Sequence, residues 1–185
     1  MDTSTWVVIG IVVLIGLWLM MTYNRLVAGR NQAKNAWSQI DVQLKRRHDL
    51  IPNLVEVVKD AMGYEQETLR QVVEARNAAV KATGPAEIGR AEAALTAATT
   101  QLFALMENYP QLKANDNVMQ LQEELTTTEN KISFSRQFYN DSIMGLNNMV
   151  QSFPANLIAG MFGFTEMPHL DIPESERAVP KVNLR

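Results

Sequence analysis

The most prominent pattern in the chain is an apolar stretch from Trp6 to Tyr23 that contains no charged residue. At about 1.5 Å per residue it is roughly 27 Å long, close to the hydrocarbon thickness of a bilayer. A cleaved signal peptide is the alternative, but no Lys or Arg precedes the stretch and no A-x-A site follows it. The pattern therefore predicts a transmembrane helix, whose anchoring side chains include Trp6, Ile9, Val13, Leu17 and Tyr23.

Beyond this stretch, apolar positions recur in heptads, which is typical of a helix that packs along one seam. We therefore expect the anchor to continue into the body of the protein as a helix. Pro52 falls inside the pattern, and because it lacks a backbone donor it should kink the helix or split it near Asp49. The seam consists of Tyr23, Leu26, Ala33, Trp37, Ile40, Leu44, Ile51, Leu54, Val58 and Ala61.

Two strong turn signals divide the rest of the chain. Thr83-Gly84-Pro85 and Asn108-Tyr109-Pro110 both end helical patterns. They predict a second helix over about 86–106 and a third over about 117–152, which Asn115 or Asp116 can cap. No strand pattern appears.

Amphipathic helices joined by short connections favour an antiparallel bundle. The expected fold class is thus all-α, with an N-terminal transmembrane helix that continues into a bundle of long, coiled-coil-like helices. Three helices pack in this bundle if Pro52 only kinks the first, and four if it splits it. We expect a short N-terminus (1–5), the transmembrane helix (6–23), the bundle (24–152), a short amphipathic helix (153–164) and an extended tail (165–185).

The charges that flank the apolar stretch predict its orientation. Only Asp2 precedes it, whereas Arg25, Arg30 and Lys34 follow closely. Since positive charge is retained in the cytoplasm, the bulk of the chain is expected on the cytoplasmic side of a single-pass membrane protein.

Composition excludes several function classes. Among 185 residues there is no cysteine, so disulfides, thiolate catalysis and cysteine-based zinc sites are absent. A net charge of -3 does not favour nucleic acid as a partner. Paired Glu-x-x-His motifs, H-E-x-x-H, G-x-S-x-G and a glycine-rich phosphate loop are also missing. We expect no catalytic residue, metal, cofactor or small-molecule substrate, and therefore no enzyme.

One charged residue falls on the apolar seam. Arg47 should be partly buried there, where it needs a carboxylate partner, and Glu129 beside the seam of the third helix is the first candidate. Such a pair could set the register of the core or serve as an interaction site. The alternative is a solvated helix face with an arginine that reaches water.

Near the C-terminus, five apolar residues fall on one face of a short helical segment. A membrane surface is one possible partner, but this segment carries no Lys or Arg. We favour packing across the end of the bundle or against a second subunit. The expected contact residues are Phe153, Leu157, Ile158, Met161 and Phe162.

Several long motifs resemble those of the bacterial LemA family. They include Trp37-Ser38-Gln39-Ile40-Asp41 through Val55, Thr128-Glu129-Asn130-Lys131-Ile132, Arg136 through Asp141, and Phe153-Pro154-Ala155-Asn156. The resemblance covers the chain from Tyr23 to Phe164. It implies a bacterial inner-membrane protein with one N-terminal span and a cytoplasmic helical bundle, and it supplies no catalytic residues.

The sequence thus favours a membrane-anchored, non-enzymatic scaffold that self-associates into a homo-oligomer, because anchoring concentrates subunits in two dimensions. The alternative is an adaptor that presents its bundle to another membrane complex, such as a protease or an envelope-stress sensor. A homo-oligomer predicts a large discrete mass, whereas an adaptor predicts a monomer or dimer with an exposed apolar groove.

Overall fold

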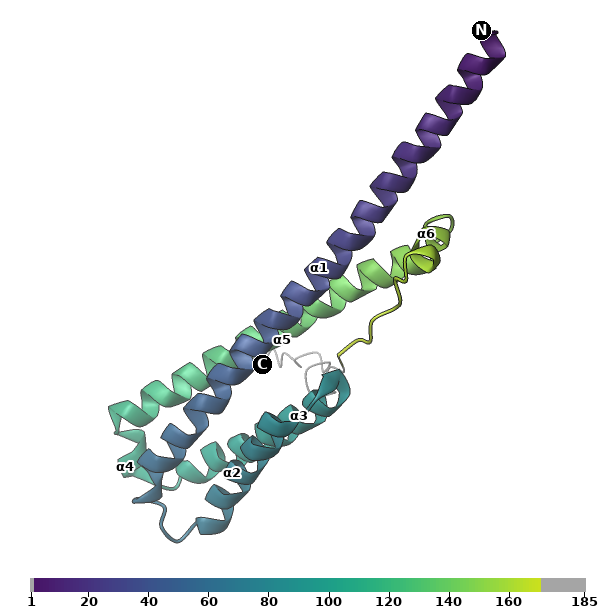
Figure 1. Ribbon diagram of the computed structural model, residues 1–185. Helices are drawn as coiled ribbons and strands as arrows, with labels where there is room; N and C mark the ends of the chain where they lie inside the picture. The colour runs from purple at the N-terminus through teal and green to yellow at the C-terminus, as the bar shows by residue number, and fades with distance from the viewer. Residues whose placement is uncertain (1, 171–185) are drawn as a thin grey trace, which may run out of the picture. The chain divides into compact units, whose positions relative to one another are not determined.

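A computed structural model describes residues 2–170 of the chain, and this part is all-α, without a strand. Its residues form two compact units, which we name by their content. The anchor unit contains residues up to 38 together with 137–169, and the bundle unit contains 39–136. The helices are α1 (Thr3–Lys59), α2 (Gln66–Lys81), α3 (Gly84–Met106), α4 (Pro110–Lys113), α5 (Asp116–Gln151) and α6 (Ala155–Met161) (Figure 1).

Helix α1 passes through Pro52 without interruption, so of the two expected alternatives, a kink or a split near Asp49, the split does not occur. Proline lacks an N–H, which leaves the carbonyl four residues earlier without its helical donor. That carbonyl belongs to His48, and it accepts a hydrogen bond from Nε of Arg76 at 3.1 Å. The guanidinium from α2 supplies the donor that Pro52 lacks, and α1 continues to Lys59.

The first long helix is interrupted instead at residues 60–65, which form the turn between α1 and α2. Gly63 lies in this turn, at the place where the apolar period slips in the sequence. The bundle unit therefore gains its fourth long helical segment from this turn and not from Pro52.

The turn between α2 and α3 depends on Gly84, whose φ of +75° is accessible to glycine at little cost. The backbone N–H of Thr83 donates to Glu87 Oε2 at 2.9 Å, and its hydroxyl donates to the same oxygen at 3.1 Å. These two bonds, the backbone one first, hold the pKa of the Glu87 carboxyl below its usual value. They explain locally why one helix ends and the next begins here.

The predicted cap of the third long helix is present. Asn115 Oδ1 accepts hydrogen bonds from the backbone N–H groups of Asn117 and Val118, at 3.0 and 3.3 Å. Between α3 and this cap lies α4, a helix of four residues that the periodicity does not predict because it is too short to show a period.

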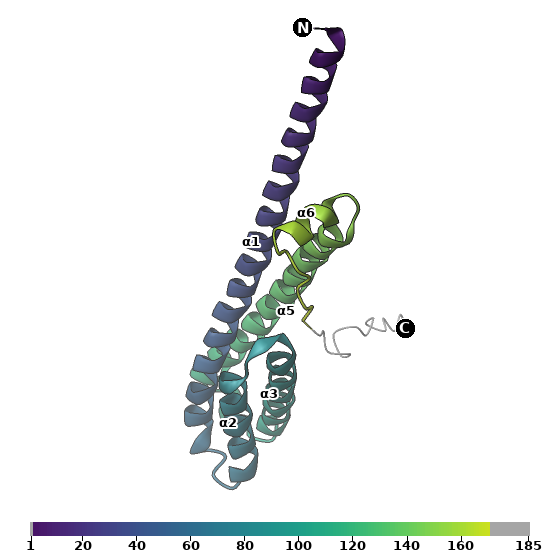
Figure 2. The same ribbon diagram turned by 45° about the vertical axis from the view of Figure 1, so that its right-hand side comes forward.

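The core of the bundle unit draws on every helix of that unit. In Figures 1 and 2, α2 and α3 run side by side in opposite directions. The seam residues of α1 that belong to this unit are buried, as the heptad spacing predicts. The core contains Ile51, Leu54, Val58 and Met62, with Leu69 and Val72 from α2, Leu95 and Leu102 from α3, Leu112 from α4, and Val118 and Leu125 from α5.

The anchor unit has a separate apolar core, in which the start of α1 packs on the end of α5 and on α6. Its buried members include Leu26, Leu146 and Ile158. Gly29 allows a close approach, because a Cβ at that position would lie 2.9 Å from the end of the Met149 side chain. Trp18 packs against the edge of the same core.

The segment after α6 lies along α5. The side chain of Asn147 donates to the Met167 carbonyl and accepts from the Met167 N–H, both at 2.9 Å. The buried Tyr139 hydroxyl donates to the Pro168 carbonyl at 3.3 Å, and burial raises the pKa of this phenol. The first residues of the predicted tail (165–185) are therefore attached to α5, while 171–185 lie outside the described residues.

Within the described residues, one helix has the length and composition needed to cross a membrane. It is α1, whose most apolar window of 18 residues has a mean hydropathy of 2.3 and no buried residue. The window lies near the N-terminus, as does the stretch that the sequence predicts to be transmembrane.

The bond between Arg76 and His48 can be tested by a double-mutant cycle with Pro52. We expect Arg76→Ala to lower the free energy of unfolding by about 1–3 kcal/mol, because it leaves a carbonyl without a donor. In the Pro52→Ala background the restored N–H reaches that carbonyl, so the same change should cost less. Urea unfolding of the four proteins measures the coupling, and strictly additive effects would contradict it.

Arg70→Ala is the matched control on the same helix. Arg70 pairs with Glu67 and Glu74 on the solvent-exposed side of α2, so its loss should change stability little in either background.

Candidate functional site

The most unusual site in the bundle unit is a buried cluster of charges around Arg47. This arginine lies on α1 and is only 2% exposed. Its Nη1 lies 3.0 Å from Glu92 Oε2, and its Nη2 lies 2.8 Å from Glu129 Oε2. Nη2 also donates to Thr96 Oγ1 at 2.9 Å. One guanidinium thereby joins α1 to α3 and to α5.

Glu92 is shared between two neighbours on α1. Its Oε2 accepts from Arg47, and its Oε1 lies 2.6 Å from Nε2 of His48. Because a carboxylate oxygen accepts hydrogen bonds, the imidazole donates through Nε2. Glu92 is 1% exposed, so its carboxylate has lost its hydration. The hydrogen bonds from Arg47 and His48 offset the free-energy cost of that loss.

The structure brings the predicted residues Arg47 and Glu129 together. It also shows two partners of Arg47 that the sequence analysis missed, Glu92 and Thr96. Glu129 also accepts from the Thr96 hydroxyl at 3.1 Å. Glu92 lies in an alanine-rich helix on the same stripe as Ile88 and Leu95, four residues after one and three before the other. A carboxylate on an apolar stripe is the signal that identifies such a partner.

The geometry of the cluster fits a structural ion-pair network. The Thr96 hydroxyl is held between Arg47 and Glu129, so it is not placed against a free general base. A cavity of about 160 Å³ is lined by Arg47 and Glu129 of the cluster, together with threonines and Phe103. In the described part of the chain, no group of three or more His, Cys, Asp or Glu side chains could hold a metal ion.

The predicted anchoring residues all lie in the anchor unit, at the start of α1. These residues are between 38% and 62% exposed, and among them Tyr23 contacts the rings of Phe162 and Phe164. They are Trp6, Ile9, Val13, Leu17 and Tyr23.

The predicted contact face near α6 is divided by the structure. Phe153, Leu157, Met161 and Phe162 are exposed. Ile158 is 3% exposed and packs in the core of the anchor unit, so it cannot contact a partner.

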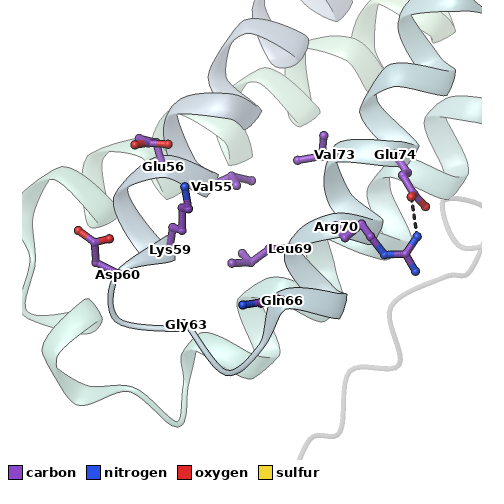
Figure 3. A pocket seen from close by; sticks show the side chains of 10 residues that line it. All are labelled: Val55, Glu56, Lys59, Asp60, Gly63, Gln66, Leu69, Arg70, Val73 and Glu74. Atoms are coloured by element: carbon purple, nitrogen blue, oxygen red, sulfur yellow. Dashed lines mark hydrogen bonds and ion pairs between the residues drawn. The ribbon is translucent and has the colours of Figure 1, made fainter.

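A groove with a volume of about 710 Å³ lies between the end of α1 and α2 in the bundle unit. Val55, Leu69 and Val73 point into it (Figure 3). Its rim is charged, with Arg70 bonded to Glu74 on one side. The sequence analysis did not place residues here, since the groove arises only from the way that α2 folds back on α1.

The sequence profile of the LemA family matches residues 36–184, which covers the whole charge cluster. The chain belongs to the LemA family. The family resemblance drawn from the motifs is therefore confirmed, and the match begins after the candidate span. Arg47, Glu92 and Glu129 all lie inside the region that the LemA family shares.

Individual relatives are distant but cover most of the chain. Protein LemA of Metamycoplasma hominis is 26% identical over 165 residues, which is 83% of this chain and 74% of that protein. Magnetosome protein MamQ 2 of Paramagnetospirillum magneticum is 25% identical over 172 residues. MamQ of Magnetospirillum gryphiswaldense is 24% identical over 177 residues. The aligned parts span 63% and 65% of the two magnetosome proteins.

Arg47→Ala tests the charge cluster. Removing one member of a buried ion pair leaves its partners uncompensated, so we expect a loss of about 3–5 kcal/mol in the free energy of unfolding. The neighbouring Arg46, whose pair with Glu124 is exposed, is the matched control, and Arg46→Ala should cost less than about 1 kcal/mol. Equal losses would contradict the structural role of Arg47.

A double-mutant cycle between Arg47 and Glu129 separates this pair from the rest of the cluster. We expect a positive coupling energy, because the two charges are 2.8 Å apart. Thermal unfolding followed by circular dichroism measures it, and zero coupling would remove the pair from the set of stabilising interactions.

Proposed function

We propose that this LemA-family protein is a membrane-anchored, non-enzymatic helical scaffold that self-associates. The observation that carries the proposal is α1 itself, a helix of 57 residues that starts with an exposed apolar stretch and ends in the core of the bundle unit. A helix of this kind supplies an anchor and a packing surface in one element.

The charges next to the apolar stretch favour a cytoplasmic body at the inner membrane of a bacterium. Arg25, Arg30 and Lys34 follow the stretch, and only Asp2 precedes it. The bilayer is thus the first partner of the protein, reached through residues 6–23.

The bonding among the buried charges supports a role without catalysis. Glu92 is bonded to both Arg47 and His48, so its two carboxylate oxygens are already occupied by partners within the bundle unit.

Exposed aromatic residues on α5 support self-association. Phe134, in the bundle unit, is 72% exposed, and Phe138, in the anchor unit, is 43% exposed. The free energy falls when a neighbouring subunit covers such side chains and removes their apolar surface from water. Because the anchor confines subunits to a plane, even a weak contact of this kind favours lateral assembly.

The mass of the full-length protein in mild detergent tests self-association. Light scattering coupled to size exclusion should give a discrete mass several times 20.8 kDa after subtraction of the detergent. The double variant Phe134→Ser with Phe138→Ser should shift the mass toward the monomer and keep its helicity. Met119→Ser, at an exposed apolar residue elsewhere on α5, is the control and should retain the assembly.

An adaptor that binds another membrane protein is the second candidate, and the groove between α1 and α2 favours it. Its apolar floor at Val55, Leu69 and Val73 and its charged rim suit an amphipathic helix of a partner. A monomeric or dimeric mass for the unaltered protein would contradict the scaffold and favour the adaptor.

A further inference from the structure

Four large apolar side chains are exposed within ten residues around α6. Phe153 is 79% exposed, Leu157 61%, Met161 76% and Phe162 54%. All four lie in the anchor unit, and none of them belongs to the buried core that includes Ile158. A patch of this size in water is unfavourable, so something of low polarity should cover it.

The position of α6 along α1 indicates what covers it. The ring of Phe162 lies 4.8 Å from the ring of Tyr23, and the ring of Phe164 lies 5.9 Å from it. Tyr23 is the last residue of the apolar stretch, where aromatic side chains mark the membrane interface. Figures 1 and 2 show α6 at the end of α5, on the side of α1 where α5 lies.

The apolar core of the anchor unit, to which α6 contributes, also includes contacts from within the apolar stretch of α1. Trp18 packs against the core that contains Ile158 and Phe164. It precedes Tyr23 by five residues, which is roughly 7 Å along a helix. The packing of α6 thus overlaps the part of α1 that the bilayer would surround.

The chain around α6 contains no charged side chain. No Asp, Glu, Lys or Arg occurs between Asp141 and Glu166, so this end of the anchor unit can enter a lipid interface without burying an ion. Basic groups come from α1 instead. Arg30 lies 4.0 Å from the centre of the Phe164 ring and donates to the Gly163 carbonyl at 3.3 Å, while Arg25 is exposed.

We propose that α6 and the residues that flank it form a second membrane contact, which inserts Phe153, Leu157, Met161 and Phe162 into the interface beside the span. The inference rests on the membrane anchor of the proposed function. The occupant of the patch is the acyl-chain boundary of the same bilayer, because lipids surround the span at the level of Tyr23. The arginines of α1 supply the cationic groups that α6 lacks and that interfacial helices place toward headgroups.

Single-cysteine labelling tests this contact cleanly, because the natural chain contains no cysteine. The full-length variants Leu157→Cys and Met161→Cys are labelled with an environment-sensitive fluorophore and reconstituted in vesicles of phosphatidylcholine and phosphatidylglycerol. Val13→Cys reports on the span, and Tyr64→Cys, in the turn after α1, reports on a fully exposed position. Circular dichroism checks that each variant keeps its helicity.

The contact predicts that probes at Leu157 and Met161 are quenched by nitroxide lipids and protected from aqueous iodide. Roughly half of the emission should be lost to lipids labelled near the headgroup, since interfacial helices lie about 5–10 Å into the boundary. The probe at Val13 should respond to the lipid quencher and the probe at Tyr64 to iodide.

Two outcomes would overturn the second contact and leave the anchor intact. In the first, Leu157 and Met161 behave like Tyr64 while Val13 is quenched by lipid. In the second, they are protected from both quenchers, which would identify a second copy of the chain as the cover. If Val13 itself responds only to iodide, the anchor fails, and the second contact fails with it.

Discussion

Two adjacent residues of α1, Arg47 and His48, link that helix to all the other long helices of the bundle unit. Arg47 bonds to Glu92 of α3 and to Glu129 of α5, and His48 shares Glu92. The carbonyl of His48 accepts from Arg76 of α2. Since a buried ion costs free energy when its partner is displaced, a shift of α1 by even one residue would leave several charges uncompensated. The register of the four helical segments therefore depends on this cluster.

The same region explains how a proline is accommodated inside a helix of 57 residues. Pro52 deprives the His48 carbonyl of its helical donor, and the guanidinium of Arg76 replaces it. The backbone of α1 and the side-chain network of the bundle unit are thus joined at one residue. Continuity of α1 matters for function, because this helix begins as the candidate anchor and ends as a core element.

The exposed apolar residues of the two units differ in what surrounds them. In the bundle unit the apolar seam is covered by α2, α3 and α5, and Phe134 is among the apolar side chains that remain exposed. In the anchor unit the exposed ring of Phe162 lies 4.8 Å from the ring of Tyr23, at the end of the apolar stretch of α1. Lipid can cover a hydrophobic surface near Tyr23, whereas another protein can cover a hydrophobic surface of the bundle unit. Anchoring and assembly can therefore use separate surfaces.

Local pattern alone determined the class of this protein. The apolar stretch, the heptad seam through Leu54, the turn at Gly84 and the family motifs are properties of neighbouring residues, so they can be read without coordinates. The tertiary structure decided which residues compensate one another across long distances in the chain. Glu92 as the partner of Arg47, Arg76 as the donor near Pro52, and the burial of Ile158 all depend on packing between helices. Periodicity identifies the face of a helix, but only the fold determines which side chains meet there.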